Sequence, residues 1–136
     1  MNLDAFRTLM RYSVFREAVE RYVQLFLVTV SQTSICNRVH VIEKLCIARL
    51  LHMQDRTGTE SFFVTQDYFA RLLGVRRATI SRVAARLQQH GAIRYDGKGR
   101  LTILDRGRLE KLACHCYHAI KSEFDNFVLR LSSNHR

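Results

Sequence analysis

The chain has 136 residues and a mass of 15.9 kDa, which suits one domain or one small domain with an appendage. It carries 22 Lys and Arg against 12 Asp and Glu, a formal net charge of +10. Apolar residues make up 47% of the chain, which excludes a disordered basic tail and indicates a folded core under a positive surface. Such a surface favours a polyanionic partner, either nucleic acid or an anionic membrane.

Several classes of protein are excluded by the apolar pattern. The longest dense apolar stretch, Tyr22 to Val30, is far shorter than the roughly 20 residues that a spanning helix needs. The N-terminus alternates charged and apolar residues, unlike a secretory signal. We therefore expect a cytoplasmic protein whose four cysteines are reduced thiols. The absence of proline indicates a mostly helical chain, because helix interiors exclude it.

The N-terminal third is predicted to be helical. Apolar residues three or four positions apart predict one long helix over residues 3–32. Between Tyr22 and Val30 they surround most of that helix, so this part is expected to contact two different surfaces. Polar residues 31–34 are predicted to end it, and a second helix is predicted over 35–53. The apolar stripe of this second helix is Ile35, Val39, Ile42, Cys46 and Leu50.

The middle of the chain predicts a strand and two short helices. Residues 62–64 are apolar and favour a strand. Thr65 is a suitable N-cap for a helix over 66–73, and Gly74 is expected to end it. A longer helix is predicted over 76–89.

The remainder predicts a hairpin and two further helices. Strands at 93–95 and 100–104 flank a Gly-containing turn at 96–99, a pattern typical of a β-hairpin. Asp105 can cap a helix over 106–113, and a last helix is predicted over 115–130.

This order of strand, helix, tight turn, helix and hairpin describes a winged helix-turn-helix. Ala70 stands where the two helices must approach closely, and Gly74 permits the left-handed backbone that the turn requires. The positions expected to pack the two helices together are Phe69, Leu72, Leu73, Val75, Ile80 and Val83. The predicted fold class is therefore mainly α, a winged helix-turn-helix with a small hairpin wing, preceded by a long dimerisation helix.

Positive charge gathers in this segment. Residues 65–100 contain eight Lys or Arg against two acids, a balance of +6. Arginines at the start of the second helix can donate paired hydrogen bonds to guanine in a major groove. The residues expected on its exposed face are Arg76, Arg77, Thr79, Ser81, Arg82 and Arg86. We expect Lys98 and Arg100 to reach backbone phosphate from the hairpin, and the helix start at Thr65 and Gln66 to bind another.

At this point the chain resembles a known family. The runs TQDYFARLLGVRRATISR and GAIRYDGKGRLTILDR are similar to the helix-turn-helix and wing of the Crp/Fnr family of bacterial transcription regulators, over about residues 35–118. The resemblance implies that Arg77, Ser81 and Arg82 read bases, and that the protein contacts RNA polymerase at a promoter. Ala78 stands where several members carry a base-reading Glu, so their half-site sequences are not transferable.

The family also carries an N-terminal β-barrel sensor of the cyclic-nucleotide-binding type. Residues 1–33 resemble only the long dimerisation helix that follows that barrel, so we expect the sensor to be missing. The expected division is this helix and a DNA-binding domain with a C-terminal helical extension over 34–136. We expect a homodimer that binds a two-fold-symmetric site in double-stranded DNA, with no cofactor.

Other interpretations remain. A metal- or redox-responsive module is one, built on Cys114, His115, Cys116 and His118. On a continuous helix, however, C-x-C points its thiols roughly 200° apart, so packed thiols and no metal are expected. Cys36 and Cys46 are expected in the core, and His40 in a structural hydrogen-bonding cluster rather than a pH sensor.

A truncated or sensorless dimerisation protein that no longer acts on DNA is a further alternative. A membrane-surface helix at Tyr22–Val30 is disfavoured because Glu17 and Glu20 interrupt its polar face. An enzyme is not expected, because no nucleophile stands at a suitable spacing from a base.

Overall fold

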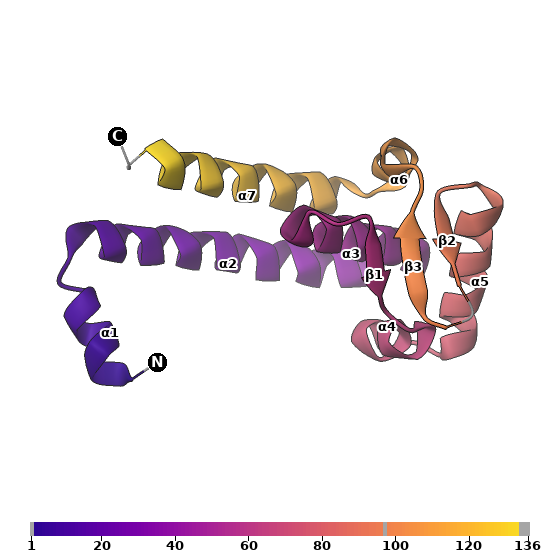
Figure 1. The fold of residues 1–136 in the computed structure, drawn as a ribbon, viewed down its shortest axis with the longest axis horizontal. Coiled ribbons are helices and arrows are strands. Elements are labelled where there is room, and N and C mark those ends of the chain that lie inside the picture. The colour runs from indigo at the N-terminus through magenta and orange to yellow at the C-terminus, as the bar shows by residue number, and fades with distance from the viewer. Residues whose placement is uncertain (1, 97, 134–136) are drawn as a thin grey trace. The chain divides into compact units, whose positions relative to one another are not determined.

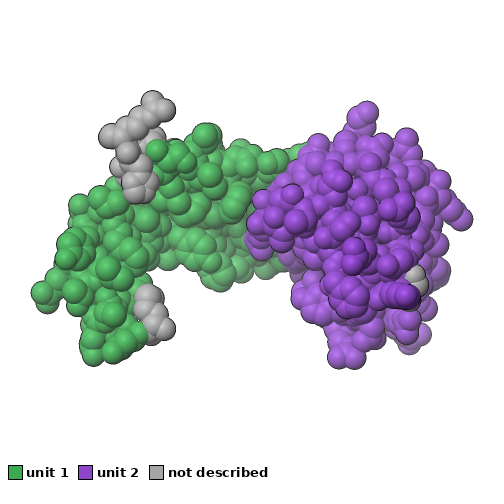
Figure 2. Space-filling model, in the orientation of Figure 1, with its two compact units in different colours: residues 1–35, 118–136 green, residues 36–117 purple. Residues whose placement is uncertain are grey.

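The computed structural model describes residues 2–96 and 98–133, which divide into two compact units (Figure 2). Residues 1–35 and 118–136 make up unit 1, and residues 36–117 make up unit 2. The sequence placed the boundary at residues 33 and 34 and assigned the whole C-terminal part to the DNA-binding domain. In the structure, residues 118–133 belong to the same compact unit as the N-terminal segment, and the division by function stays a prediction.

Unit 1 is built from helices. It contains α1 (Leu3–Leu9), most of α2 (Ser13–Val39) and most of α7 (His115–Ser133). Within the unit α2 and α7 run side by side, and the rings of Tyr22 and Phe127 contact each other with centroids 6.2 Å apart (Figure 1). In the described part of the chain, no helix combines the length and apolar character needed to cross a membrane.

The predicted boundaries of the N-terminal helices are wrong in two places. The helix predicted over 3–32 is interrupted between Leu9 and Ser13, and α2 continues without a break through residues 31–34. The hydroxyl of Ser34 donates to the carbonyl of Val30 at 2.9 Å, one turn earlier. The hydroxyl thus bonds within the helix and caps no new one, so the polar run does not end α2.

The next helix, α3 (Ile42–Thr57), starts later than predicted. Ile35 and Val39 belong to α2 and are 51% and 68% exposed. Cys46 and Leu50 do lie in the core, as the apolar stripe predicted. The predicted apolar stripe therefore marks the core-facing side only at the positions that lie within α3.

Unit 2 confirms the predicted winged helix-turn-helix. After α3 its elements are β1 (Ser61–Phe63), α4 (Gln66–Leu73), α5 (Arg77–Gln89), β2 (Ile93–Tyr95), β3 (Arg100–Ile103) and α6 (Arg106–Leu112). The side chains of Thr65 and Asp105 accept hydrogen bonds from the amides of Tyr68 and Arg108, at 3.1 and 2.9 Å, as N-caps do. Gly97, in the predicted hairpin turn, lies outside the described residues.

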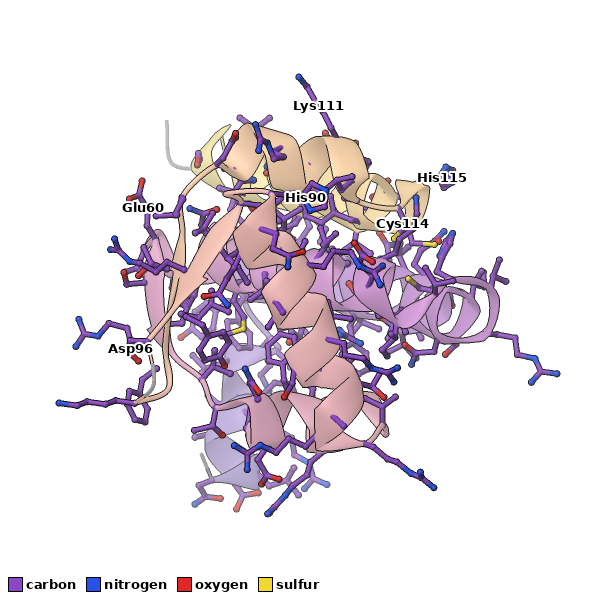
Figure 3. All side chains as sticks on the ribbon, turned by 90° about the vertical axis from the view of Figure 1, so that its right-hand side faces the viewer. Glu60, His90, Asp96, Lys111, Cys114 and His115 are labelled. Carbon is purple, nitrogen blue, oxygen red and sulfur yellow. The ribbon has the colours of Figure 1, made fainter. Side chains whose placement is uncertain are left out.

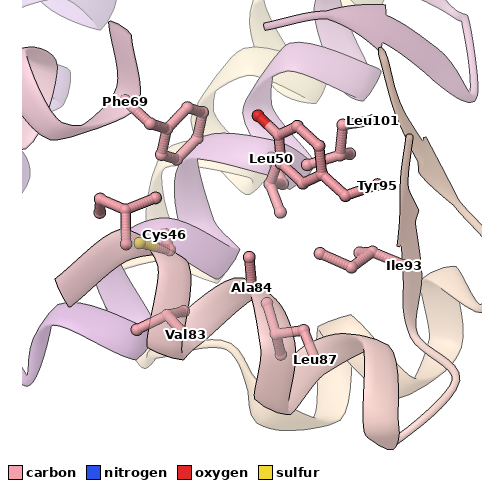
Figure 4. Close-up of a pocket in the computed structure, with 10 residues that line it drawn as sticks. Cys46, Leu50, Phe69, Val83, Ala84, Leu87, Ile93, Tyr95 and Leu101 are labelled. Carbon is pink, nitrogen blue, oxygen red and sulfur yellow. The ribbon is translucent and has the colours of Figure 1, made fainter. Parts of the chain in front are cut away.

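The three strands form an antiparallel sheet in the order β1-β3-β2. Phe62 pairs with Leu101, and Leu101 with Tyr95, so these residues share the face that covers the core. Figure 4 shows this core between α3, α5 and the sheet, around an apolar cavity of about 20 Å³. A cavity of this size holds at most one water molecule, so the core offers no space for an organic ligand.

The turn between α4 and α5 has the expected construction. Gly74 adopts φ of 65°, and the amide of Val75 donates to the carbonyl of Ala70 at 3.0 Å. Ala70 is only 3% exposed, because α5 packs closely there. Phe69, Ile80 and Val83 are buried and Leu73 and Val75 partly buried, as predicted, whereas Leu72 is 49% exposed and does not join the interface.

Replacing Gly74 by Ala tests the turn. A Cβ at this position would meet no heavy atom within 4 Å, so the only cost is the left-handed backbone. We expect Gly74→Ala to lower the free energy of unfolding by about 1–2 kcal/mol in urea denaturation. Gly107→Ala, at a helical position in α6, is the control and should be neutral or stabilising. Equal effects of the two substitutions would contradict the assigned role of Gly74.

Candidate nucleic-acid interface

The start of α4 is bonded directly to α5. The hydroxyl of Ser81 donates to Oε1 of Gln66 at 2.5 Å, and both side chains are half-buried. The amide nitrogen of Gln66 keeps its two donors, and the hydroxyl of Thr65 keeps its proton while accepting from Tyr68. Two adjacent donors therefore stand beside the first turns of α5.

The hairpin of β2 and β3, the wing, lies against the segment that leads into α4. The amide of Val64 donates to the carbonyl of Gly99 at 2.9 Å, and the hydroxyl of Tyr95 donates to the carbonyl of Val64. A Cβ at Gly99 would lie 3.1 Å from Cγ2 of Thr65. Burial, with a smaller effect of Asp96, raises the pKa of Tyr95 to about 12, so the phenol remains a donor at neutral pH.

Asp96 shapes the tip of the wing. One of its carboxylate oxygens accepts from the amides of Lys98 and Arg100, at 3.0 and 2.7 Å. The carboxylate is thus bonded to backbone amides, and the side chains of Lys98 and Arg100 remain exposed. Figure 3 shows Asp96 at one end of the hairpin. The wing tip, Thr65 and the start of α5 are therefore linked by consecutive contacts.

Two cations of this region already have a carboxylate partner. Arg71 pairs with Asp67 at 2.8 Å along α4, and Arg86 pairs with Glu43 of α3. The other six have no ion-pair partner within residues 2–96 and 98–133. We call them the free cations, and they are Arg76, Arg77, Arg82, Arg94, Lys98 and Arg100.

The predicted interface residues divide by accessibility. Those that the structure exposes are Thr65, Arg76, Arg77, Arg82, Arg86, Lys98 and Arg100. Those that are half-buried are Gln66, Thr79 and Ser81. Sequence reasoning omitted Arg94, which is exposed on β2 and pairs in register with Thr102. The alternation of buried Ile93 with exposed Arg94 is the signal that could have identified it.

Chemically, this surface suits a phosphate backbone and the base edges beside it. Arg77 is exposed and is the first residue of α5, the position from which recognition helices contact bases. Guanidinium groups can bind guanine or phosphate through two parallel hydrogen bonds. Lys98 at the wing tip offers a point charge that can bind a phosphate. Such a contact does not depend on the base sequence.

Comparison with known proteins agrees with this geometry. Residues 46–112 match the family described as the Crp-like helix-turn-helix domain. No curated protein matched the chain. The resemblance to Crp/Fnr regulators that the sequence suggested is thus confirmed for this segment.

Two solved structures resemble the chain. One is from Eubacterium rectale and is described as a transcriptional regulator of the Crp/Fnr family. It shares 26% sequence identity with this chain and has a TM-score of 0.58; the match covers 80% of this chain and 50% of that one. The other is a Crp/Fnr-family transcriptional regulator from Thermus thermophilus, with 19% identity and a TM-score of 0.49, covering 82% of this chain and 55% of that one. This chain therefore spans about half the length of the structures that it matches.

The ion pair between Arg86 and Glu43 leads to a prediction for the interface. Glu43 is mostly buried by the pair, so Arg86→Ala should cost about 1 kcal/mol of unfolding free energy, and Glu43→Gln a similar amount. A double-mutant cycle in urea denaturation should show that the two losses are not additive. Two results would instead place Arg86 in the DNA interface: additive losses of unfolding free energy in the cycle, and a loss of DNA affinity in Arg86→Ala equal to that in Arg82→Ala.

Proposed function

Residues 46–112 are a Crp-like helix-turn-helix domain, and from this premise we propose that the chain is a DNA-binding transcription regulator that acts as a homodimer on a two-fold-symmetric promoter site. In this proposal α5, with its N-cap Arg76, lies in the major groove of double-stranded DNA. The protein has no catalytic role, and it acts in the cytoplasm, where bacterial promoters are found.

The observation that carries the proposal is the set of free cations on the start of α5 and on the wing, two elements that Thr65 and Gln66 link to each other. Three of them, Arg76, Arg77 and Arg82, belong to the start and first turns of α5, and the others belong to the wing. Neutralising DNA phosphates with such groups releases condensed counterions, which supplies much of the affinity. The arginines on α5 add base recognition, which a merely solvated basic face would not supply.

Thr65 and Gln66 have a positioning role in this proposal. The N-terminal amides of α4 and the donors of these two side chains can bind a phosphate beside the groove that α5 enters. The bond between Gln66 and Ser81 fixes that contact relative to α5. By family resemblance, Ser81 also contributes to base reading, and the bound protein contacts RNA polymerase.

The homodimer is supported by exposed apolar side chains on α2. Val23, Phe26, Leu27 and Val30 are 45–58% exposed and are spaced three or four residues apart, so they share one side of the helix. A contiguous apolar stripe of this kind on a helix is typical of a helix–helix interface. Two copies joined through α2 would present two α5 helices to successive turns of DNA, with half-sites about 10 bp apart.

Two substitutions distinguish base reading from phosphate binding. Arg77→Ala should cost about 1–3 kcal/mol of binding free energy and relax the preference at one base position. Lys98→Ala should weaken all sequences alike and reduce the slope of log affinity against log salt by about 1. Both are measured by selection of binding sites from random duplexes, followed by titrations at several salt concentrations.

Lys111→Ala is the control, because this exposed lysine lies on α6, away from the wing tip (Figure 3). It removes the same charge and should leave the selected sequence and the salt slope unchanged. If no sequence is enriched with the wild-type chain, the alternative of an interaction protein that no longer acts on DNA is favoured. If Arg77→Ala leaves specificity intact, α5 is not the recognition helix.

The dimer is tested by placing a charge in the α2 stripe. Leu27→Glu should convert a dimer into a 15.9 kDa monomer in analytical ultracentrifugation, because an unpaired carboxylate cannot be buried between two helices. Leu104→Glu, at a leucine 52% exposed in unit 2, should leave the dimer intact. A wild-type chain that remains monomeric at micromolar concentration would exclude the proposed assembly.

A further inference from the structure

Three thiols and an imidazole converge in unit 2, at a place that the DNA-binding surface does not use. All four ligand atoms lie within 4.8 Å of one another. The three cysteines are at most 6% exposed, and the histidine is half-buried. The side chains that make up this thiol–imidazole cluster are Cys36, His40, Cys114 and Cys116.

We propose that the thiol–imidazole cluster is a binding site for one zinc ion, with three thiolates and one imidazole as ligands. Zinc prefers sulfur and nitrogen ligands in a closed tetrahedron at structural sites. With zinc–sulfur bonds of about 2.3 Å and zinc–nitrogen bonds of about 2.0–2.1 Å, neighbouring ligand atoms of such a site lie about 3.6–3.8 Å apart.

Two of the six distances between ligand atoms are already close to those of that tetrahedron, and all six are within 4.8 Å. The Sγ atoms of Cys36 and Cys114 are 3.5 Å apart, and Sγ of Cys116 is 3.8 Å from Nδ1 of His40. A disulfide would need sulfur atoms about 2.05 Å apart, so Cys36 and Cys114 are separate thiols here. The compactness of the cluster favours a single ion, and the soft ligand set favours zinc over a hard cation.

The ligands come from two places that are far apart in sequence. Cys36 and His40 are four residues apart at the C-terminal end of α2, and the amide of His40 still donates to the carbonyl of Cys36 at 3.0 Å. That helical spacing places both side chains on one face. Cys114 lies 78 residues further along, in the connection between α6 and α7.

The position of Cys114 corrects the expectation from the C-x-C spacing. The sequence prediction placed both thiols on one continuous helix, where they would diverge. Instead α7 begins at His115, Ala113 is extended with ψ of 159°, and Cys114 precedes the helix. The two thiols can therefore turn to the same side, while His115 is exposed and points away from the sulfur atoms (Figure 3).

The sequence-based ligand set is also replaced. That alternative combined Cys114 and Cys116 with His115 and His118. In the structure His40 is the imidazole of the cluster, and neither His115 nor His118 belongs to it. A ligand set that joins residues 76 and 78 positions apart could not be read from local spacing.

Other contacts hold the segment with Cys114 and Cys116 in place. Next to Cys116, the hydroxyl of Tyr117 donates to Asp55 of α3 at 3.1 Å. The guanidinium of Arg106 in α6 donates to the same carboxylate at 2.7 Å and to the Tyr117 hydroxyl at 2.9 Å. The α6–α7 connection is thus fixed on α3, and the ion would find the ligands of this segment already arranged.

A zinc ion at this site would fasten the two ends of unit 2 to each other. Unit 2 begins at Cys36 and ends at Tyr117, so the helix-turn-helix lies between the two ligand segments. Metal that binds only the folded arrangement stabilises it, because the unfolded chain offers no such site. The zinc site is independent of the DNA-binding proposal and is tested without DNA.

The first experiment uses the full wild-type chain, purified under reducing, oxygen-free conditions without chelator. Elemental analysis should find about one zinc ion per chain. Titration of the zinc-free protein with Co²⁺ should give the intense visible bands of tetrahedral cobalt with thiolate charge transfer, which saturate at one equivalent and vanish when Zn²⁺ is added.

Variants locate the ligands. Cys36→Ser and His40→Gln should each weaken cobalt binding by more than the 10–100-fold that loss of a supporting residue causes, since they remove a direct ligand. Cys46→Ser is the matched control: Cys46 is equally buried and lies outside the cluster. His115→Gln tests the ligand set that local spacing suggested. Both controls should bind cobalt as the wild type does.

Four outcomes would overturn the proposal. The first two are a wild-type chain that binds neither zinc nor tetrahedral cobalt, and an iron–sulfur chromophore in the purified protein. The third is a Cys36–Cys114 disulfide in peptide maps of the protein prepared under reducing conditions. The fourth is a cobalt spectrum that His40→Gln leaves unchanged. If a variant fails to fold, the number of zinc ions per wild-type chain and the cobalt spectrum of the wild type decide the proposal. A chelator should lower the melting temperature of the wild type and leave that of Cys36→Ser unchanged.

Discussion

The close packing of α4 against α5 is the constraint on which the rest of unit 2 depends. Ala70 allows the two helices to approach, and the left-handed Gly74 begins the three-residue turn between them. Because Ile80 must then face inward, the rotation of α5 about its axis is fixed, and its arginines face outward. The bond from Ser81 to Gln66 holds the same register, and the wing is placed by its contact with Thr65.

This arrangement separates two kinds of positive charge. Arg71 and Arg86 are paired with carboxylates of a neighbouring turn or helix. The free cations have no such partners among the described residues, so their charge is available to a polyanion. A count of charges along the sequence treats the two groups alike, whereas the proposed affinity for DNA rests mainly on the second.

The thiol–imidazole cluster gives unit 2 a second set of long-range constraints. The proposed DNA-binding surface is assembled from residues 65–100, while the cluster joins the segments before and after them. Its ligands are held by apolar burial and by the bonds of Asp55 with Arg106 and Tyr117. The two sites are therefore built into one fold from different parts of the chain, and a change in one need not disturb the contacts of the other.

Elements whose signals are local could be predicted from the amino-acid sequence alone. Thr65 caps a helix and Gly74 ends it through contacts within a few residues, so the winged helix-turn-helix and most of its exposed cations were predictable. Ser34 was misread because a hydroxyl can cap a helix or bond within it, and the surrounding helix decides which. Only the tertiary structure brought Cys36 to Cys114 and Arg86 to Glu43, since chain separation says nothing about which distant side chains packing brings together.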